Sequence, residues 1–118
     1  MIKSLKPAVL LLVIATVAFS AVTQINPKNF QQKVQEAPYT LVYLYSSSCN
    51  FCKEFTPAYE KLQNHQKIKE LGVALTKIDG PTYQDFALAL EVYSYPSLLF
   101  YRKGVPLPIH FYRARKEK

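Results

Sequence analysis

Two cysteines separated by two residues form the part of the sequence best suited to chemistry. Cys49 and Cys52 are the only cysteines of the 118-residue chain. On a helix this spacing puts them one turn apart on the same face. Two thiols so placed can open and close a disulfide without moving the backbone, and can exchange it with other thiols. The spacing therefore predicts a pair that cycles between dithiol and disulfide.

The residues around the pair predict a strand that runs into a helix. Residues 41–45 are an apolar run with β-type side chains, 46–48 are three serines, and helical character begins at Cys49. A sulfur at a helix N-terminus faces unpaired N–H groups and the positive end of the dipole, which favour thiolate over thiol. Cys49 is therefore the candidate nucleophile, and Cys52, shielded one turn inside the helix, is the candidate resolving thiol.

Two structural roles for the cysteines compete with a redox role. A structural zinc site needs four ligands, and the spacing of the cysteines with His65 and His110 matches no zinc module. A structural disulfide across so short a loop would constrain little of the unfolded chain. We therefore expect no metal and no cofactor beyond a Cys49–Cys52 disulfide, and we assign no role to the two histidines.

The N-terminus has the pattern of a targeting segment. Lys3 and Lys6 precede an uncharged apolar run over residues 8–22, and small residues at 18 and 20 suit cleavage after Ser20. We expect residues 1–20 to be a signal peptide and 21–118 to be one domain. The stretch 7–25 carries no charge and is 19 residues long, so an uncleaved membrane anchor is the alternative.

Export of this kind indicates an oxidising compartment, where a cysteine pair can form a disulfide and exchange it. We expect the lumen of the endoplasmic reticulum, or secretion, although the last four residues are not a KDEL-type retrieval signal. The net charge of +7 includes a basic tail, Arg113, Arg115, Lys116 and Lys118. No basic stripe or stacking motif accompanies this tail, so we expect no nucleic acid partner.

Strand-type and helix-type patterns alternate along the rest of the chain. Residues 27–35 should form a helix capped by Asn26, 49–71 a helix kinked at Pro57, and 83–90 a helix opened by a capping box at Thr82. The expected strands are 22–25, 40–45, 73–78, 98–101 and 109–112. This order predicts an α/β fold with a mixed central sheet flanked by helices. Pro96, at the mouth of the fourth strand, is a candidate cis proline.

With these motifs in this order, residues 24–115 resemble the thioredoxin superfamily, and most closely a protein disulfide isomerase-type domain. The resemblance is carried by the motif over residues 45–57, by Tyr95-Pro96-Ser97 as the cis-proline loop, and by Gly104 eight residues after that proline. Lys77 matches the family's lysine on the third strand, and Arg115 its arginine near the end of the last strand.

The resemblance implies a thioredoxin-like fold and a thiol-disulfide oxidoreductase or isomerase that acts on protein clients of the secretory pathway. It implies catalytic roles for Cys49, Cys52, Lys77 and Arg115, and contact of Tyr95 and Pro96 with the client backbone. A membrane partner is expected only if the N-terminal segment stays uncleaved.

The chain also departs from the family. Ser48 replaces its tryptophan, Asn50-Phe51 its usual Gly-His or Gly-Pro, and Tyr43 its buried acidic residue. A phenol with a reference pKa of about 10 accepts a proton poorly at neutral pH, so proton transfer to and from Cys52 should be slow. The alternative function is therefore a weakly active chaperone or peptide-binding module. The family's closing helix has no counterpart before Lys118, so we expect one flank of the sheet to be uncovered.

Overall fold

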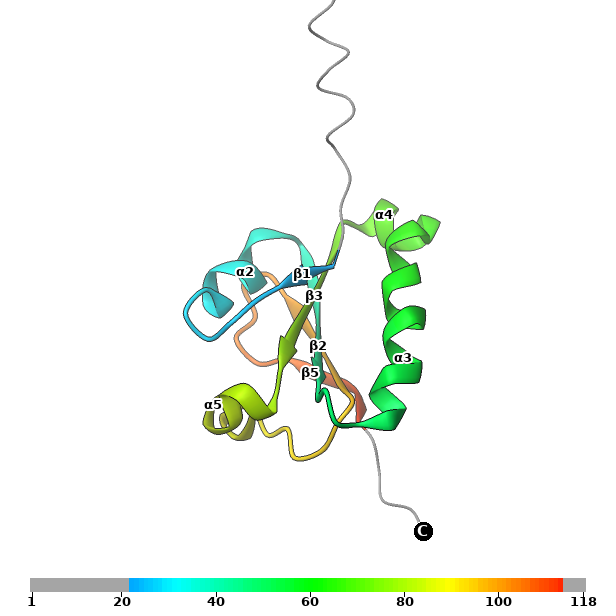
Figure 1. Ribbon diagram of the computed structural model, residues 1–118. Coiled ribbons are helices and arrows are strands. Elements are labelled where there is room, and N and C mark those ends of the chain that lie inside the picture. Colours follow the sequence, from blue (N-terminus) through cyan, green and yellow to red (C-terminus); the bar gives the residue numbers. More distant parts are fainter. Residues whose placement is uncertain (1–21, 114–118) are drawn as a thin grey trace, which may run out of the picture.

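A five-stranded mixed sheet organises the molecule, which the computed structural model describes for residues 22–113 (Figure 1). The strand order is β1-β3-β2-β4-β5; β1, β3 and β2 run parallel, and β4 and β5 are antiparallel to their neighbours. The strands are β1 Thr23–Gln24, β2 Tyr39–Tyr45, β3 Val73–Asp79, β4 Ser97–Arg102 and β5 Ile109–Arg113. All five expected strands are confirmed within two residues at each end.

Helices cover both faces of this sheet. In Figure 1, α2 (Phe30–Glu36) and α5 (Gln84–Ala89) lie on one side, and α3 (Asn50–Lys61) and α4 (Gln66–Leu71) lie on the other. This arrangement is the thioredoxin-like α/β fold that the sequence predicted.

The central strand β2 contributes to two cores because its side chains alternate between the faces of the sheet. Val42 and Leu44 are fully buried in the core beneath α2 and α5. Leu41 and Tyr43 are buried in the core beneath α3. Such burial on both faces explains why the strand is an unbroken run of apolar and aromatic residues with one threonine. It also holds rigid the strand that ends just before the cysteines.

The start of the first helix was predicted wrongly. It begins at Phe30 instead of residue 27. The Asn26 side chain accepts hydrogen bonds from the N–H groups of Lys28 and Asn29 at 2.8 and 3.1 Å, and the Asn29 side chain accepts one from Asn26 N at 2.9 Å. These mutual bonds stabilise a turn outside the helix, because asparagine side chains compete with helical hydrogen bonds.

The predicted helix over 49–71 is in fact interrupted. It ends at Lys61, a short 3-10 turn follows over Leu62–Asn64, and α4 starts afresh at Gln66. The break lies at His65, whose backbone is extended and whose Nδ1 accepts the Lys67 N–H at 3.2 Å. His65 therefore has a local structural role as a helix cap, which the sequence analysis did not assign.

The capping box proposed at Thr82 does not form either. Pro81–Tyr83 is a 3-10 turn and α5 begins one residue later, at Gln84. Asp79 instead accepts the Thr82 N–H at 3.2 Å, because the end of β3 leads directly into this turn.

Several expectations concern parts of the chain that lie outside the described residues. They are the signal peptide or anchor over 1–20, Arg115 and the absence of a closing helix after β5. Within residues 22–113, no helix has the length and apolar character needed to cross a membrane. On the α4 side, an apolar groove of about 380 Å³ is lined by Tyr39, Leu41, Leu62, Ile68, Leu71, Val73, Phe100 and Phe111.

Candidate active site

The two cysteines lie at the junction between strand β2 and helix α3. Cys49 is the N-cap residue of α3, with extended backbone angles, and Cys52 lies in the first turn. Both are free thiols; Cys49 is partly exposed, whereas Cys52 is 2% exposed. The placement of Cys49 at the helix N-terminus, predicted from the sequence, is confirmed.

Hydrogen bonds make the two sulfurs unequal. The backbone N–H of Cys52 donates to Cys49 Sγ across 3.0 Å, which stabilises negative charge on that sulfur. Burial, followed by the interaction with Cys49, raises the pKa of the Cys52 thiol to about 11. A partly exposed sulfur that accepts a hydrogen bond and a buried sulfur that keeps its proton match the nucleophile and the resolving thiol of a disulfide exchange pair.

The loop before β4 reaches the same place. The Tyr95–Pro96 peptide bond is cis, as expected, and the Tyr95 carbonyl accepts a hydrogen bond from the Cys49 thiol at 3.7 Å. Gly80 packs against the Tyr95 ring so closely that a Cβ on Gly80 would clash with it. Burial raises the pKa of the Tyr95 hydroxyl, with a second contribution from Asp79. The structure thus brings Tyr95 and Pro96 together with Cys49.

The serines before Cys49 form the turn that positions its side chain. Ser46 Oγ lies 3.2 Å from Ser48 Oγ and accepts the Ser48 N–H, and the Cys49 N–H donates to the Ser46 carbonyl at 3.2 Å. Such hydroxyl-to-backbone bonds fix a turn without a large side chain. Ser48 therefore helps to shape the loop, although it replaces an aromatic residue of the family.

Tyr43 occupies the buried position beneath Cys52. Its ring is fully buried, and its hydroxyl lies 2.8 Å from Thr56 Oγ1 and 3.2 Å from the Cys52 carbonyl. Burial raises the pKa of Tyr43 to about 12. The sequence analysis missed Thr56, although its position one turn after Cys52 on the same helix face was a usable signal.

The amino group of Lys77 contacts groups other than the cysteines. It pairs with Tyr43 across the β2–β3 ladder, but its Nζ lies 3.6 Å from Glu60 Oε2 and 5.9 Å from the centre of the Tyr45 ring. Glu60 was not singled out from the sequence, because only the packing of α3 on β3 brings it to Lys77. The ion pair is partly exposed, so its stabilising contribution is small.

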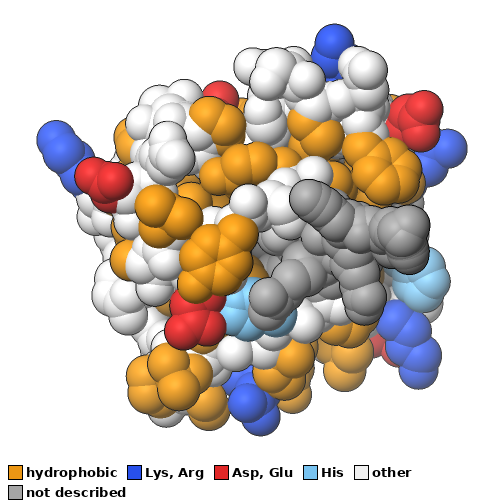
Figure 2. Space-filling model, turned by 90° about the horizontal axis from the view of Figure 1, so that it is seen from below, with side chains coloured by type: hydrophobic (Ala, Val, Ile, Leu, Met, Phe, Trp, Pro, Cys, Tyr) orange, Lys and Arg blue, Asp and Glu red, His pale blue; other side chains and the backbone are white. Residues whose placement is uncertain are grey.

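Exposed aromatic side chains accompany the active site. Figure 2 shows the molecule from the end at which α3 begins, with many hydrophobic side chains and with charged side chains mainly at the periphery. Phe51, between the cysteines, is 57% exposed, and Tyr93, just before the cis-proline loop, is 70% exposed. Exposed aromatic side chains are typical of surfaces that bind other proteins.

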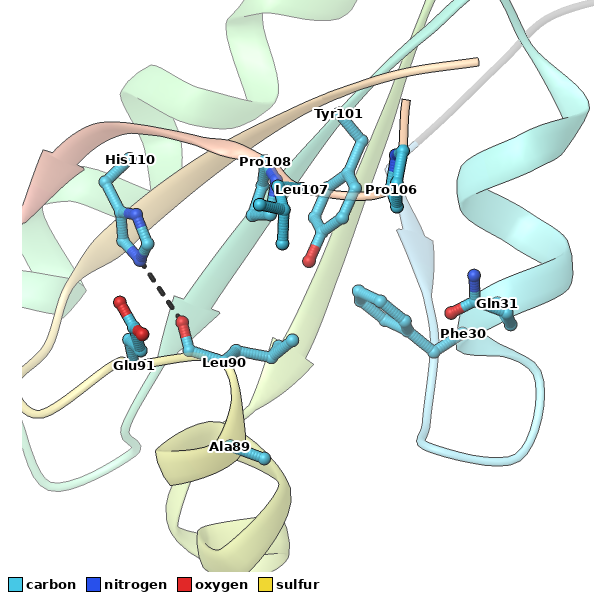
Figure 3. Close-up of a pocket in the computed structure, with 10 residues that line it drawn as sticks. All are labelled: Phe30, Gln31, Ala89, Leu90, Glu91, Tyr101, Pro106, Leu107, Pro108 and His110. Atoms are coloured by element: carbon cyan, nitrogen blue, oxygen red, sulfur yellow. Dashed lines mark hydrogen bonds between the residues drawn. The ribbon is translucent and has the colours of Figure 1, made fainter. Parts of the chain in front are cut away.

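His110 lies apart from the cysteines, on the side of the sheet covered by α2 and α5. It lines a cavity of about 320 Å³ between α2, the end of α5 and the segment before β5 (Figure 3), and its Nε2 lies 3.2 Å from the Leu90 carbonyl. This bond ties β5 to the end of α5. In the described part of the chain, no group of three or more His, Cys, Asp or Glu side chains could hold a metal ion.

Comparison with known proteins agrees with this geometry. The model of the thioredoxin family matches residues 21–118. Protein disulfide-isomerase A4 of Homo sapiens is 32% identical over 94 residues, which are 80% of this chain and 14% of that protein. The protein disulfide-isomerase of Drosophila melanogaster is 33% identical over 79 residues, 67% of this chain and 16% of that protein. The chain thus spans only a small part of the length of these relatives.

Solved structures show the same similarity. The first thioredoxin domain of mouse protein disulfide-isomerase A4 superposes with a TM-score of 0.66 at 25% identity, covering 85% of this chain and 74% of that one. A thioredoxin of Malassezia sympodialis gives a TM-score of 0.67 at 20% identity and covers 79% of this chain and 78% of that one. At 20% identity, the similarity to the Malassezia thioredoxin concerns the fold alone.

Proposed function

Because the chain belongs to the thioredoxin family, with a domain of the protein disulfide isomerase type, we propose that it exchanges disulfides with protein clients of the secretory pathway. Family membership supports thiol-disulfide oxidoreductase chemistry in general. The finer assignment, to secretory clients, rests on the charge pattern and apolar run of the N-terminal segment.

One observation carries the proposal: the partly exposed Cys49 sulfur caps α3, receives the Cys52 N–H at 3.0 Å and contacts the loop that ends in cis Pro96. In the proposed reaction Cys49 attacks a client disulfide and Cys52 then displaces the client. Tyr95 and Pro96 hold the client backbone, and the cysteine pair needs no other cofactor. By the family resemblance, Lys77 and Arg115 assist this exchange, which for Lys77 requires its amino group to leave Glu60, 3.6 Å away.

The test is insulin reduction by the purified protein with dithiothreitol, followed by turbidity. We expect activity above the dithiothreitol blank, its loss in Cys49→Ser, and a trapped mixed disulfide in Cys52→Ser. Activity that survives in Cys49→Ser would rule out the proposed nucleophile. Mass spectrometry of the protein exported from cells tests the location, since cleavage after Ser20 removes residues 1–20.

A second candidate is a peptide-binding chaperone module with slow exchange chemistry. The exposed side chains of Phe51 and Tyr93 favour it, because they offer apolar contacts beside the cysteines that need no redox step. Suppression of client aggregation separates the two functions. A binding module keeps this activity when both cysteines are replaced by serine, whereas an oxidoreductase loses its effect.

A further inference from the structure

Among residues 22–113, the groups that lie beneath the resolving cysteine are hydroxyls, with no carboxylate among them. The Tyr43 hydroxyl and Thr56 Oγ1 lie 2.8 Å apart, and both reach the Cys52 carbonyl, at 3.2 and 2.9 Å. The two hydroxyl protons are shared among three oxygens: Thr56 Oγ1 donates to the Cys52 carbonyl, and the Tyr43 hydroxyl donates to Thr56 Oγ1 or to the same carbonyl. These hydrogen bonds fix the first turn of α3 against β2.

None of these groups can take the proton of Cys52 at neutral pH. A threonine hydroxyl is not basic, and burial raises the pKa of Tyr43 to about 12, so its phenol is already protonated. Any acceptor must therefore come from the charged or titratable residues on the surrounding elements. In the described part of the chain these are the N-cap residue Cys49, Lys53, Glu54, Tyr59, Glu60 and Lys61 on α3, Tyr39 and Tyr45 on β2, Lys77 and Asp79 on β3, and Tyr95 before β4.

The charged groups among them are exposed or engaged elsewhere. Lys53 and Glu54 are exposed, Glu60 is paired with Lys77 at 3.6 Å, and Asp79 accepts the Thr82 N–H at 3.2 Å. No described carboxylate has a hydrogen bond to Cys52. In the mixed disulfide the Cys49 sulfur is bonded to the client and is no longer a base, so the proton of Cys52 leaves through solvent, to which the residue is 2% exposed.

We propose that the domain holds its clients covalently, because the mixed disulfide between Cys49 and a client cysteine outlives the attack that forms it. This inference rests on the disulfide exchange proposed above, and its slow step is the attack of Cys52 on the mixed disulfide. Tyr43 is a positioning residue in it: its hydroxyl fixes the turn that carries Cys52 and fills the space in which a base would act.

The exchange takes two steps. The Cys49 thiolate attacks one sulfur of a client disulfide, the Cys49–client bond forms, and the second client sulfur leaves as a thiolate. Release requires Cys52 to lose its proton and attack Cys49 Sγ. The Cys49–Cys52 disulfide then forms, the client sulfur leaves as a thiolate, and two electrons have passed from the cysteine pair to the client.

Oxidation of a client by the Cys49–Cys52 disulfide passes through the same mixed disulfide between Cys49 and the client. A client thiolate attacks Cys49 of the oxidised pair, and Cys52 leaves as a thiolate. Because burial raises the pKa of Cys52 to about 11, that thiolate takes up a proton and cannot readily attack again. The client stays attached until another thiol releases it.

The experiment uses the reduced purified protein and one equivalent of 5,5′-dithiobis(2-nitrobenzoate) in a stopped-flow spectrometer. The first release of thionitrobenzoate reports attack by Cys49, and the second reports attack by Cys52. We expect a second step that accelerates about tenfold for each pH unit between 7 and 9, because the thiolate fraction rises in that proportion. We expect Tyr43→Glu to accelerate that step at pH 7 by about tenfold or more.

Tyr43→Gln is the matched control, since it has the shape of glutamate without a basic oxygen. We expect it to leave the second step slow. A second step that does not change between pH 7 and 9 would overturn the proposal, and so would equal rates in Tyr43→Glu and Tyr43→Gln. If circular dichroism shows that Tyr43→Glu does not fold, the pH profile of the unsubstituted protein decides alone.

The same stopped-flow traces distinguish failure of this inference from failure of the proposed function. A first release that persists at full rate in Cys49→Ser contradicts the assignment of Cys49 and with it the proposed exchange. A normal first release followed by a fast second step that is independent of pH overturns only the covalent holding of clients.

Discussion

Cys52 donates its backbone N–H to the sulfur of Cys49 across 3.0 Å, so the first turn of α3 stabilises charge on one sulfur while it buries the other. Cys52 is 2% exposed and burial raises its pKa to about 11. Two identical side chains three residues apart thus receive opposite environments from a single helical turn. This difference underlies the first two predictions.

Alkylation should distinguish the two thiols. Brief treatment of the reduced protein with iodoacetamide at pH 7 should modify Cys49 first, because Cys52 is buried and holds its proton. Peptide mass spectrometry locates the label, and Cys49→Ser should be alkylated at least about 10-fold more slowly than Cys52→Ser, because its one remaining thiol is buried. Preferential labelling of Cys52 would contradict the assignment.

Phe51→His should make the pair more oxidising. An imidazolium between the cysteines stabilises a thiolate on Cys49, which Phe51, 57% exposed, cannot do. At a solvated site the gain is about 1 kcal/mol, which raises the reduction potential by roughly 20 mV. Equilibration with glutathione buffers at pH 6 measures the shift. Phe51→Gln is the control, and an equal shift in both variants would exclude the charge as its cause.

Tyr59→Phe should destabilise the fold without touching the cysteines. Its hydroxyl, within a side chain 1% exposed, donates to the carbonyls of Thr76 at 2.7 Å and Leu41 at 3.2 Å. Loss of these buried bonds should lower the free energy of unfolding by about 1–3 kcal/mol. Urea titration measures it. Tyr93→Phe, at a position 70% exposed, should stay within about 0.5 kcal/mol of the unsubstituted protein.

Stability should fall when the pH rises above about 10. Burial raises the pKa of Tyr43 and Tyr101 to about 12, and it also raises that of Tyr59, from an ordinary value of 10.0. Above that ordinary value the unfolded chain loses these protons while the folded chain keeps them, so the contribution of the tyrosines is full below pH 10 and declines above it. The buried Cys52 thiol, whose pKa is raised from 9.0 to about 11, adds a decline that begins near pH 9. Each tyrosine adds a slope of up to about 1.4 kcal/mol per pH unit.

Urea titrations at pH 9, 10 and 11 measure this decline, and absorbance at 295 nm follows the ionisation of the tyrosines. Tyr101→Phe should reduce the slope because it removes one of the three groups. A free energy of unfolding that stays level from pH 9 to 11 would contradict the prediction.

Sequence alone determined the features that depend on neighbouring residues. The pair Cys49 and Cys52, the apolar strand that ends before it and the proline at the mouth of β4 were all placed correctly, because spacing and backbone preference are local properties. The order of helices and strands followed from the same patterns. Element ends were less certain: Asn26, His65 and Asp79 bind nearby backbone N–H groups in ways that several local geometries could satisfy.

Only the tertiary structure decided which groups meet. Lys77 faces Tyr43 across the β2–β3 ladder, as its place on the third strand implied, yet its amino group lies beside Glu60. Thr56 joins Tyr43 under Cys52 for a similar reason. Both contacts depend on how α3 packs over β2 and β3, and residues more than a dozen positions apart in sequence carry no local signal of such packing. The sequence identified the two reactive sulfurs, whereas the packing of α3 on β2 and β3 determines which side chains surround them.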